Sequence, residues 1–386
     1  MKQIGLRAVF MRGGTSKAVM FRAEDLPRDR ARWTPIFLGV IGSPDANGRQ
    51  LDGMGGGLSS LSKVCVIGAP TRADADVDYT FAQVSIIGAT VDYSGNCGNM
   101  SSAVGPFAVD EGLVKATGGE AVVRIHNTNT KKIIVARFAI DEGRAAVDGD
   151  FVLPGVAGTG APVRLDFLDP GGAGTGRLLP TGKVVEQLEV AGLGTVEASM
   201  VDAANPCVFV AAEALGMSGI EMPEILEANR DLIGKLEAIR VTASLRMGIA
   251  RTAAEAASKP SIPKIALVTG PREAQTLAGE RIAAEAADLT VRMISIGQPH
   301  RAVPLTGAMC LAVASRLPGS VAHRVTRSAE SREAPVRIAQ PSGLTVVGAG
   351  VRESAGEWMA ERATVYRTAR RLMEGIVFVR ASAMTN

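Results

Sequence analysis

The sequence predicts an α+β fold of two similar domains, each with strands wrapped around a central buried helix. Three observations lead to this prediction. Many short segments are rich in Val and Ile and are bounded by Gly, Pro or Asn, which is typical of strands. Two segments dense in Ala, Val and Met read as helices that are apolar around most of their circumference, so they belong in an interior. The order of loop, helix and strand pair occurs twice along the chain.

The repeated arrangement begins each time with a loop that contains glycine. In the first copy, "SGNCGN" leads into "MSSAVGPFAVDEGLV", and the segment 123–138 then reads as strand, tight turn and strand. In the second copy, "VPLTGAM" leads into "CLAVASRLPGSVAHRV", followed by the same pattern over 336–351. Both strand pairs start with "VRI" and have Asn or Gln two residues later. We therefore expect two related halves.

The remaining strands and helices are assigned from composition and length. Two longer helices are expected at 220–238 and 272–288. Short Val- and Ile-rich strands are expected in "KVCVIGA", "FAQVSIIGATVDY", "KKIIVARFAI", "VEASMVDAANPCVFV", "PKIALVTG", "LTVVGAG" and "GIVFVRA".

Composition restricts the class of protein. A chain of 386 residues is too long to fold readily around a single hydrophobic core, which indicates two domains. The net charge is only +3 and no basic block is present, which argues against a nucleic-acid partner. No apolar run is long enough to span a bilayer, and the first residues lack the apolar core of a signal peptide. The four cysteines are far apart in the sequence, so we expect a cytoplasmic protein without a disulfide framework.

Several common ligand motifs are excluded. The three histidines, His126, His300 and His323, have no metal-ligand spacing, so no metal site is expected. "GGAGTG" at 171–176 lacks a surrounding strand and helix and reads as a surface loop. "GRLLPTGK" at 176–183 has the wrong glycine spacing for a phosphate-binding loop, and Val184 follows where Ser or Thr should stand.

The starts of the two central helices indicate an anionic ligand. Free backbone N–H groups and the positive end of the helix dipole favour negative charge at a helix start. If the two starts face each other across a cleft, they suit one molecule with more than one carboxylate.

Two residues stand out as candidates for proton transfer. Cys97 lies at the first helix start, where the thiolate is favoured, although a structural role for this cysteine stays open. Lys63 follows the glycine- and serine-rich stretch 53–62, which we expect to be flexible and able to cover a substrate. The alternative is a solvated charge at the beginning of a strand.

A third stretch, "MRGGTSK" at 11–17, combines two glycines with two hydroxyl groups. These residues can donate hydrogen bonds to a carboxylate, with Arg12 or Lys17 as a nearby charge. A plain hairpin turn is the alternative interpretation.

These stretches together resemble the PrpF-like isomerases, a family that includes 2-methylaconitate cis–trans isomerase, methylitaconate isomerase and 4-oxalomesaconate tautomerase. The resemblance covers nearly the whole chain. It rests on "MRGGTSK", "SPDANGRQLDGMGG", "SSLSKV", "ADVDYTFAQVSI", "DYSGNCGNMSSAVGPFAV", "HRAVPLTGAMCLAVA", "LDFLDP", "LPTGKVVEQLEV", "RMG", "PKIA" and "ARRLMEGIVFV".

The resemblance implies the fold of diaminopimelate epimerase, with two pseudo-symmetric domains and the active site in the cleft between them. It implies a first domain at 1–183 that regains a C-terminal strand at 374–386, and a second domain at 184–373. The epimerases carry one cysteine on each loop before the central helix. Here Cys97 occupies the first such position, Thr306 occupies the second, and Cys310 lies inside the helix, so racemisation with two thiols is not expected.

The chemistry implied is migration or cis–trans isomerisation of a carbon–carbon double bond in a small unsaturated tricarboxylate, without a cofactor or a metal. Lys63 is expected to be the catalytic base and Cys97 the catalytic partner acid. Backbone N–H groups near both helix starts would stabilise the developing negative charge. The residues expected to bind substrate are Gly14, Thr15, Ser16, Asn96, Gly98, Asn99, Lys264, His300, Thr306, Gly307 and Ala308.

The substrate is left open among related acids. A 2-methylaconitate or aconitate type is preferred, with 4-oxalomesaconate tautomerase and methylitaconate delta-isomerase as alternatives. A third alternative is a non-catalytic accessory protein of an aconitase-type dehydratase. A homodimer and such a dehydratase are the macromolecular partners considered.

Overall fold

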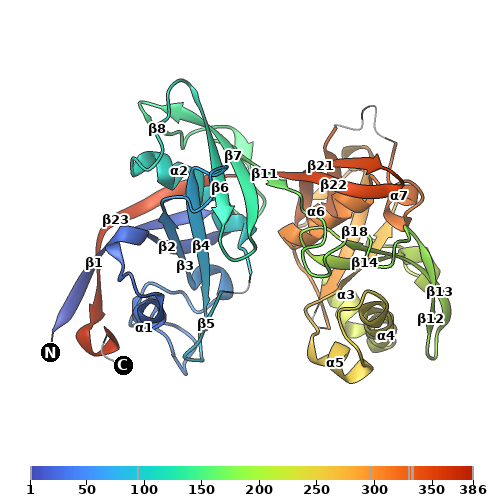
Figure 1. Cartoon of the computed structure of the whole chain (residues 1–386). Helices are drawn as coiled ribbons and strands as arrows, with labels where there is room; N and C mark the ends of the chain where they lie inside the picture. The colour runs from blue at the N-terminus through green and yellow to red at the C-terminus, as the bar shows by residue number, and fades with distance from the viewer. Residues whose placement is uncertain (1, 94, 296, 329–330, 332–333, 385–386) are drawn as a thin grey trace. The chain divides into compact units, whose positions relative to one another are not determined.

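The chain folds into two compact units. The computed structural model describes residues 2–93, 95–295, 297–328, 331 and 334–384. The first unit comprises Met1–Phe167 together with Tyr366–Asn386, and the second comprises Leu168–Val365 (Figure 1). No helix in the described part of the chain is long and apolar enough to cross a membrane.

The first unit is built mainly of strands, and its described residues contain two α-helices. Its strands are β1 (Gln3–Gly13), β2 (Ser16–Arg22), β3 (Lys63–Gly68), β4 (Val77–Val84), β5 (Val91–Asp92), β6 (Glu120–Asn127), β7 (Lys132–Asp141), β8 (Arg144–Ala145), β9 (Phe151–Val152), β10 (Thr159–Gly160), β11 (Val163–Leu168) and β23 (Ala369–Arg380). Its helices are α1 (Trp33–Ile41) and α2 (Gly98–Asp110).

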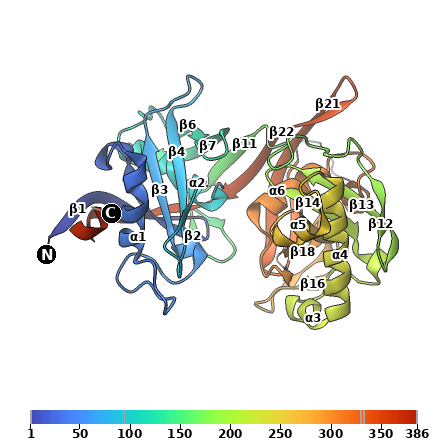
Figure 2. The ribbon, with the colours of Figure 1, turned by 60° about the horizontal axis from the view of Figure 1, so that its bottom comes forward.

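Helix α2 is the central helix that the small-residue segment predicts. Eleven of its thirteen residues are buried, and it contacts β1, β2, β3, β6, β7, β8 and β23. Because successive strand residues point to opposite faces, Val64 and Val66 of β3 pack in one core with α1, whereas Lys63 and Cys65 point to the other face. Figure 2 shows α1 and α2 on opposite sides of β3 and β4.

The second unit carries more helix. Its strands are β12 (Glu186–Val190), β13 (Gly194–Asp202), β14 (Pro206–Ala211), β15 (Lys264–Thr269), β16 (Ala274–Gln275), β17 (Arg281–Ile282), β18 (Leu289–Ser295), β19 (Gln298–Pro299), β20 (Val336–Gln340), β21 (Gly343–Ser354) and β22 (Glu357–Arg367). Its helices are α3 (Pro223–Ala228), α4 (Arg230–Arg246), α5 (Ala253–Ser258), α6 (Leu305–Ala314) and α7 (Val321–Val325).

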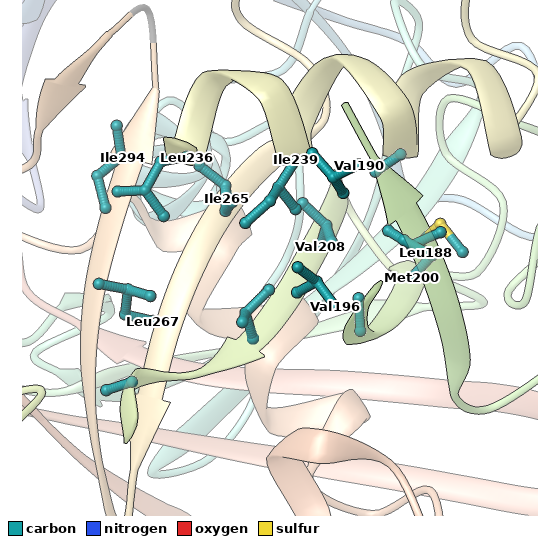
Figure 3. Packing of buried hydrophobic residues seen from close by; sticks show 14 of the residues in the cluster. Leu188, Val190, Val196, Met200, Val208, Leu236, Ile239, Ile265, Leu267 and Ile294 are labelled. Atoms are coloured by element: carbon teal, nitrogen blue, oxygen red, sulfur yellow. The ribbon is translucent and has the colours of Figure 1, made fainter. Parts of the chain in front are cut away.

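A large apolar core of the second unit lies between α4 and a face of the sheet. Figure 3 shows Leu236 and Ile239 of α4 directed at Ile265 and Val208 of the strands below. All four side chains are almost completely removed from solvent. At roughly 1.5–3 kcal/mol for each fully buried aliphatic side chain, this layer fixes the position of β15, the strand that begins at Lys264.

The strand pairings of the two units follow the same order, which confirms the repeat expected from the sequence. In the first unit β1–β2 is antiparallel, β2–β3 parallel, β3–β4 antiparallel, β4–β6 parallel and β6–β7 antiparallel. In the second unit β13–β14, β14–β15, β15–β18, β18–β20 and β20–β21 follow the same sequence of orientations. The counterpart of α2 is therefore α6, and the counterpart of β3 is β15.

One side-chain contact also repeats between the halves. The Asp76 carboxylate accepts a 2.7 Å hydrogen bond from the Arg124 N–H, and the Asp76 N–H donates to the Arg124 carbonyl. In the second unit the Asp288 carboxylate accepts a 2.8 Å bond from the Arg337 N–H, and the Asp288 N–H donates to the Arg337 carbonyl. Arg124 and Arg337 are the central residues of the two "VRI" segments, so the repeated letters correspond to a repeated contact.

The expected strands form, but one expected helix does not. Residues 220–238 contribute to α3 and α4 as predicted. Residues 272–288 instead contain the short antiparallel pair β16–β17 and a 3₁₀ turn. The reason is a tight turn in which Gly279 has φ +82° and the Thr276 N–H donates to the Glu280 carbonyl.

The unit boundaries differ from the expected positions 183/184 and 373/374. The loop around Gly174 belongs to the second unit because its N–H and that of Thr175 donate to the Asp202 carboxylate at 2.8 and 2.7 Å. The segment from Tyr366 belongs to the first unit because β23 pairs with β1 from Ala369 to Arg380.

Candidate active site

Lys63 begins β3 and is buried, with a 7% exposed surface. Its ammonium donates a hydrogen bond to Gln83 Oε1, from the residue opposite it on β4. The ammonium also lies 5.1 Å from the centre of the Phe81 ring. The interpretation of Lys63 as a solvated charge at a strand start is therefore wrong.

Cys97 is the residue immediately before α2, and its thiol is partly exposed. No side chain among the described residues caps this helix, so its first N–H groups are available to a ligand. The preceding Asn96 is held in place because its Oδ1 accepts from Asn127 Nδ2 at 3.2 Å and from Ser101 Oγ at 3.3 Å. Gly98, the first helical residue, is buried.

Helix α2, which Cys97 immediately precedes, packs against β3, the strand that begins at Lys63. Burial raises the pKa of the Cys65 thiol most strongly, Cys97 raises it further, and a hydrogen bond to Tyr79 and the Lys63 charge lower it. Burial, Cys65 and Cys97 likewise raise the pKa of Tyr79. Lys63 and Cys97, the two residues that the sequence indicates, thus both act on the Cys65 thiol.

The turn between β1 and β2 packs against the first residues of α2. Asn99 Nδ2 donates to Thr15 Oγ1 at 3.1 Å, and Asn99 Oδ1 accepts from Arg367 Nε at 3.2 Å. Gly14 and Ser16 are buried at this turn, whereas Thr15 is exposed. The turn thus lies against the start of α2, and its binding of a carboxylate stays a prediction.

Arg367 is a cation that the sequence motifs do not reveal. Desolvation lowers the pKa of its guanidinium to about 10. No carboxylate in the described part of the chain forms an ion pair with it, and it donates instead to the Asn99 amide and the Tyr366 carbonyl. A half-buried guanidinium with neutral partners is suited to bind a carboxylate of a ligand.

Arg12 and Lys17 have other partners in this unit. Arg12 donates to the carbonyls of Gly14 and Thr368 and to Thr368 Oγ1, at 2.9–3.0 Å. Burial and the Arg370 charge lower its pKa. Lys17 lies over the Phe10 ring. Arg12 therefore stabilises the hairpin turn by bonding its backbone.

The glycine-rich stretch that precedes Lys63 is fixed by one buried side chain. Gln50 Oε1 accepts from the Gly57 N–H at 2.9 Å and from Ser62 Oγ at 2.7 Å, and its Nε2 donates to Ser43 Oγ at 2.8 Å. Gln50 is only 1% exposed. The stretch 53–62 thus has a defined path, and the sequence expectation of a flexible segment did not anticipate the role of Gln50.

The second unit carries a matching group of residues at the start of α6. Lys264 begins β15, as Lys63 begins β3, and burial lowers the pKa of its ammonium. A side-chain methyl at Gly307 would lie 3.9 Å from Lys264 Cδ, so the lysine passes beside the first turn of the helix. Burial and then the Lys264 charge lower the pKa of His300 to about 4, which keeps its imidazole neutral above that pH.

Thr306, Gly307 and Ala308 form the first turn of α6, and no side chain of a described residue caps it. Thr306 is partly exposed, whereas the next two residues are buried. Cys310 is completely buried inside the helix, and its Sγ donates to the Val201 carbonyl at 3.3 Å. His300 Nε2 is buried without a hydrogen-bond partner among the described residues.

Each unit therefore presents an uncapped helix start next to a lysine, which is buried in the first unit (Lys63) and partly buried in the second (Lys264). The first unit adds a thiol and the Asn99–Arg367 pair, and the second adds a neutral imidazole. Such an arrangement can bind carboxylates and move protons. No group of three or more His, Cys, Asp or Glu side chains suited to a metal occurs in the described ranges.

Most of these residues were predictable from sequence motifs, but Gln83, Gln50 and Arg367 were not. Gln83 and Gln50 have no distinguishing neighbours in the sequence. Arg367 lies more than two hundred residues away from Asn99, and only the return of the chain through β23 brings them together.

Known proteins match this chain over nearly its whole length. A model of the family described as PrpF protein matches residues 3–380. The chain is 42% identical to the 3-methylitaconate isomerase of Eubacterium barkeri, with 98% of each chain covered. It is 41% identical to the 2-methyl-aconitate isomerase of Shewanella oneidensis, over 98% of this chain and 97% of that protein.

Solved structures agree in fold. A crystal structure of methylitaconate-delta-isomerase matches with a TM-score of 0.93 at 42% identity, covering 100% of this chain and 98% of that one. A hydroxyproline epimerase from Agrobacterium vitis matches with a TM-score of 0.52 at 12% identity, over 98% and 94% of the two chains. The second likeness concerns the fold alone, and it confirms the epimerase-like fold expected from the sequence.

Proposed function

Because the chain belongs to the PrpF family, we propose that it isomerises a small unsaturated tricarboxylate of the 2-methylaconitate or aconitate type, with Lys63 as the catalytic base. The observation that carries this proposal is the position of Lys63. It is buried, it is held by Gln83, and it shares a neighbourhood with Cys97 at an uncapped helix start.

The proposed reaction is a proton transfer within the substrate. Neutral Lys63 removes a proton from the carbon next to the double bond, and the electron pair of that C–H bond enters a dienolate. A proton then returns at the other end of the dienolate, or at the same end after rotation about the former double bond. Cys97 is the proposed donor of this proton, and no cofactor takes part in the scheme.

Each helix start, considered within its own unit, is proposed to bind a carboxylate. In the first unit the backbone from Asn96 to Asn99, together with the Gly14–Ser16 turn, would bind one carboxylate. In the second unit Lys264, His300 and the turn from Thr306 to Ala308 would likewise bind a carboxylate. Fixed donors of this kind stabilise a developing enolate by about 3 kcal/mol each, as oxyanion holes do.

Hydrogen exchange tests the proposal before the natural substrate is identified. The purified protein is incubated with trans-aconitate in deuterated water, and the vinyl and methylene signals are followed by NMR. We expect deuterium incorporation or a new alkene isomer with the wild-type protein. Lys63→Ala should lower the rate by about 10²–10⁴-fold, the usual contribution of a general base.

Lys63→Arg is the matched control for charge, because it keeps a cation at this position but supplies no base at neutral pH. It should be as impaired as Lys63→Ala. Substantial exchange by either variant would refute the assignment of Lys63.

The same assay separates the related substrates. Methylitaconate and 4-oxalomesaconate are tested beside the aconitates, and the highest kcat/KM identifies the substrate. Inertness toward every acid, combined with tight binding to an aconitase-type dehydratase, would favour the accessory role instead. Self-association into a homodimer remains a prediction that light scattering tests.

A further inference from the structure

The residue opposite Lys63 on β4 has a side chain that accepts a hydrogen bond from the lysine ammonium. Among the described residues, Gln83 Oε1 is the hydrogen-bond acceptor of Lys63, and no carboxylate lies within ion-pair distance of it. A buried lysine is normally paired with an acid. Here a neutral amide takes that place.

The orientation of the Gln83 amide is fixed by its other end. Its Nε2 donates to the Ser59 carbonyl at 3.0 Å and to the Ser62 carbonyl at 2.9 Å. Both acceptors are carbonyl oxygens, so only the NH₂ group can face them, and Oε1 must face Lys63. The amide assignment therefore follows from the hydrogen-bond network.

The segment that supplies these two carbonyls is itself held in place. Ser62 Oγ donates to the Leu58 carbonyl and to Oε1 of the buried Gln50, both at 2.7 Å. A chain of contacts thus runs from Gln50 through Ser62 to Gln83 and on to the Lys63 ammonium. Gln50, Ser62 and Gln83 are all uncharged side chains.

We propose that Gln83 is a positioning residue that fixes the Lys63 side chain through a neutral acceptor and so leaves the amine able to exchange its proton. This inference rests on the proposed function. A carboxylate in the same place would fix the lysine equally well but would stabilise its charged form, which cannot act as a base. An apolar side chain would leave the amine uncharged more readily but would not orient it.

The titratable groups around Lys63 are weakly acidic, apart from the Asp92 carboxylate, which stands on β5 opposite Gln83 and so one strand farther from the lysine. Cys65 lies on the same strand, Tyr79 on β4 and Cys97 at the start of α2. The Phe81 ring is the remaining neighbour that favours a cation. Gln83→Glu would therefore place a carboxylate in the position that directly contacts the ammonium, one strand nearer to it than Asp92.

The test compares Gln83→Glu, Gln83→Leu and the wild type by the pH dependence of kcat/KM with the best acid from the exchange assay. In Gln83→Glu we expect the apparent pKa at which kcat/KM rises with pH to increase by at least about one unit, because an adjacent opposite charge favours the ammonium. Gln83→Leu should lower kcat at least about tenfold without raising this apparent pKa. Gln275→Glu, an exposed position on β16, is the matched control and should leave the profile unchanged.

A second measurement does not depend on activity. Lysine labelled with ¹³C at Cε reports the titration of Lys63 by NMR, with the signal assigned from Lys63→Arg. A higher Lys63 pKa in this titration of Gln83→Glu supports the inference, even in a variant with low turnover. Unchanged titration and an unchanged kcat/KM profile in a folded Gln83→Glu protein would overturn it, as would wild-type kcat in Gln83→Leu.

The two proposals fail in different ways. If Lys63→Ala retains exchange activity, the proposed function of Lys63 fails, whatever Gln83 does. If Lys63→Ala is inactive but Gln83 variants change only the free energy of unfolding, the base assignment stands and Gln83 has a merely structural role.

Discussion

At the turn between β1 and β2, Gly14 is the residue whose size decides the geometry of the Asn99 amide. It has φ +53°, a conformation that residues with a side chain rarely adopt. A methyl group there would lie 2.4 Å from Asn99 Oδ1 and 3.2 Å from Arg367 Cδ. Glycine is therefore required both by the backbone and by the two side chains that close over it.

We predict that Gly14→Ala impairs activity in addition to stability. The Asn99 amide can rotate away from the new methyl group, so the cost in unfolding free energy should be only the backbone strain, about 1–2 kcal/mol. The rotation breaks the contact of Asn99 with Arg367, and kcat/KM should fall about tenfold, equivalent to 1.4 kcal/mol. Chemical denaturation and exchange kinetics measure the two effects.

Gly112→Ala is the matched control for this change. Gly112 has φ +69°, but nothing lies within 4 Å of a methyl group placed there. It should lose a similar unfolding free energy and keep wild-type kcat/KM. Equal kinetic losses in both variants would show that strain, and not the position of Asn99, causes the effect.

Single residues were predictable where the surrounding sequence was unusual. Cys97 is flanked by glycine and asparagine, and Lys63 follows a serine- and glycine-rich stretch, so both stand out in the sequence. Gln83 lies within an ordinary strand, and its importance comes from a partner twenty residues earlier in the chain. Pairing across a sheet determines such a role, and a single strand does not reveal it.

Among the elements, β6 and β20 both end in a residue with a side-chain amide, and this shared feature explains part of the repeated sequence. Asn127 ends β6, and its amide donates to Asn96 Oδ1 in the loop before α2. Gln340 ends β20, and its Oε1 accepts from the Val303 N–H, at 3.2 Å, in the loop before α6. The Asn or Gln that follows each "VRI" thus fixes the loop that leads into the central helix.

We predict that each amide stabilises only the loop that it contacts: Asn127 the loop before α2, and Gln340 the loop before α6. Asn127 is completely buried and also accepts from the Thr130 N–H and Oγ1, so Asn127→Ala should cost about 2–3 kcal/mol of unfolding free energy. Amide hydrogen exchange should accelerate in residues 95–97 and remain unchanged in residues 301–303. Gln340→Ala should give the opposite pattern.

Because hydrogen exchange is measured in both loops for both variants, each variant serves as the control for the other. Acceleration of both loops by either variant would mean that the whole protein has been loosened, and the local role of the amides would be rejected.

Elements were predictable where burial and local composition agree. The Val- and Ile-rich segments became strands because their side chains fill the interior on at least one face of a sheet. The segment 272–288 has the Ala and Glu content of a helix, yet it forms β16 and β17. Its Leu277 N–H donates to the Pro341 carbonyl, a tertiary contact with a distant segment that no local pattern contains.

At the scale of the whole molecule, the repeat of strand order explains why both units place a lysine beside a central helix. The duplication was visible in the sequence because loop, helix and "VRI" strand recur in the same order. The boundaries were harder to predict, because the Asp202 contacts and the pairing of β23 with β1 decide them. Both are contacts between segments distant in sequence.

The connectivity predicts that the units differ in their dependence on the C-terminus. The second unit is one continuous segment, Leu168–Val365, with its own core. The first unit needs β23, which pairs with β1 along eleven residue pairs. Removal of residues 369–386 should therefore unfold the first unit and leave the second folded, because β1 loses its partner on one side.

Two tryptophans allow each unit to be followed separately in this truncated protein. Trp33 belongs to the core of the first unit, and Trp358 lies on β22 of the second. With Trp358→Phe, the remaining emission should be that of an exposed indole even without denaturant. With Trp33→Phe, a cooperative denaturation transition should persist, because the strands and the core of the second unit remain intact. A single transition reported by both probes, or none by either, would show that the two units fold only as one cooperative structure.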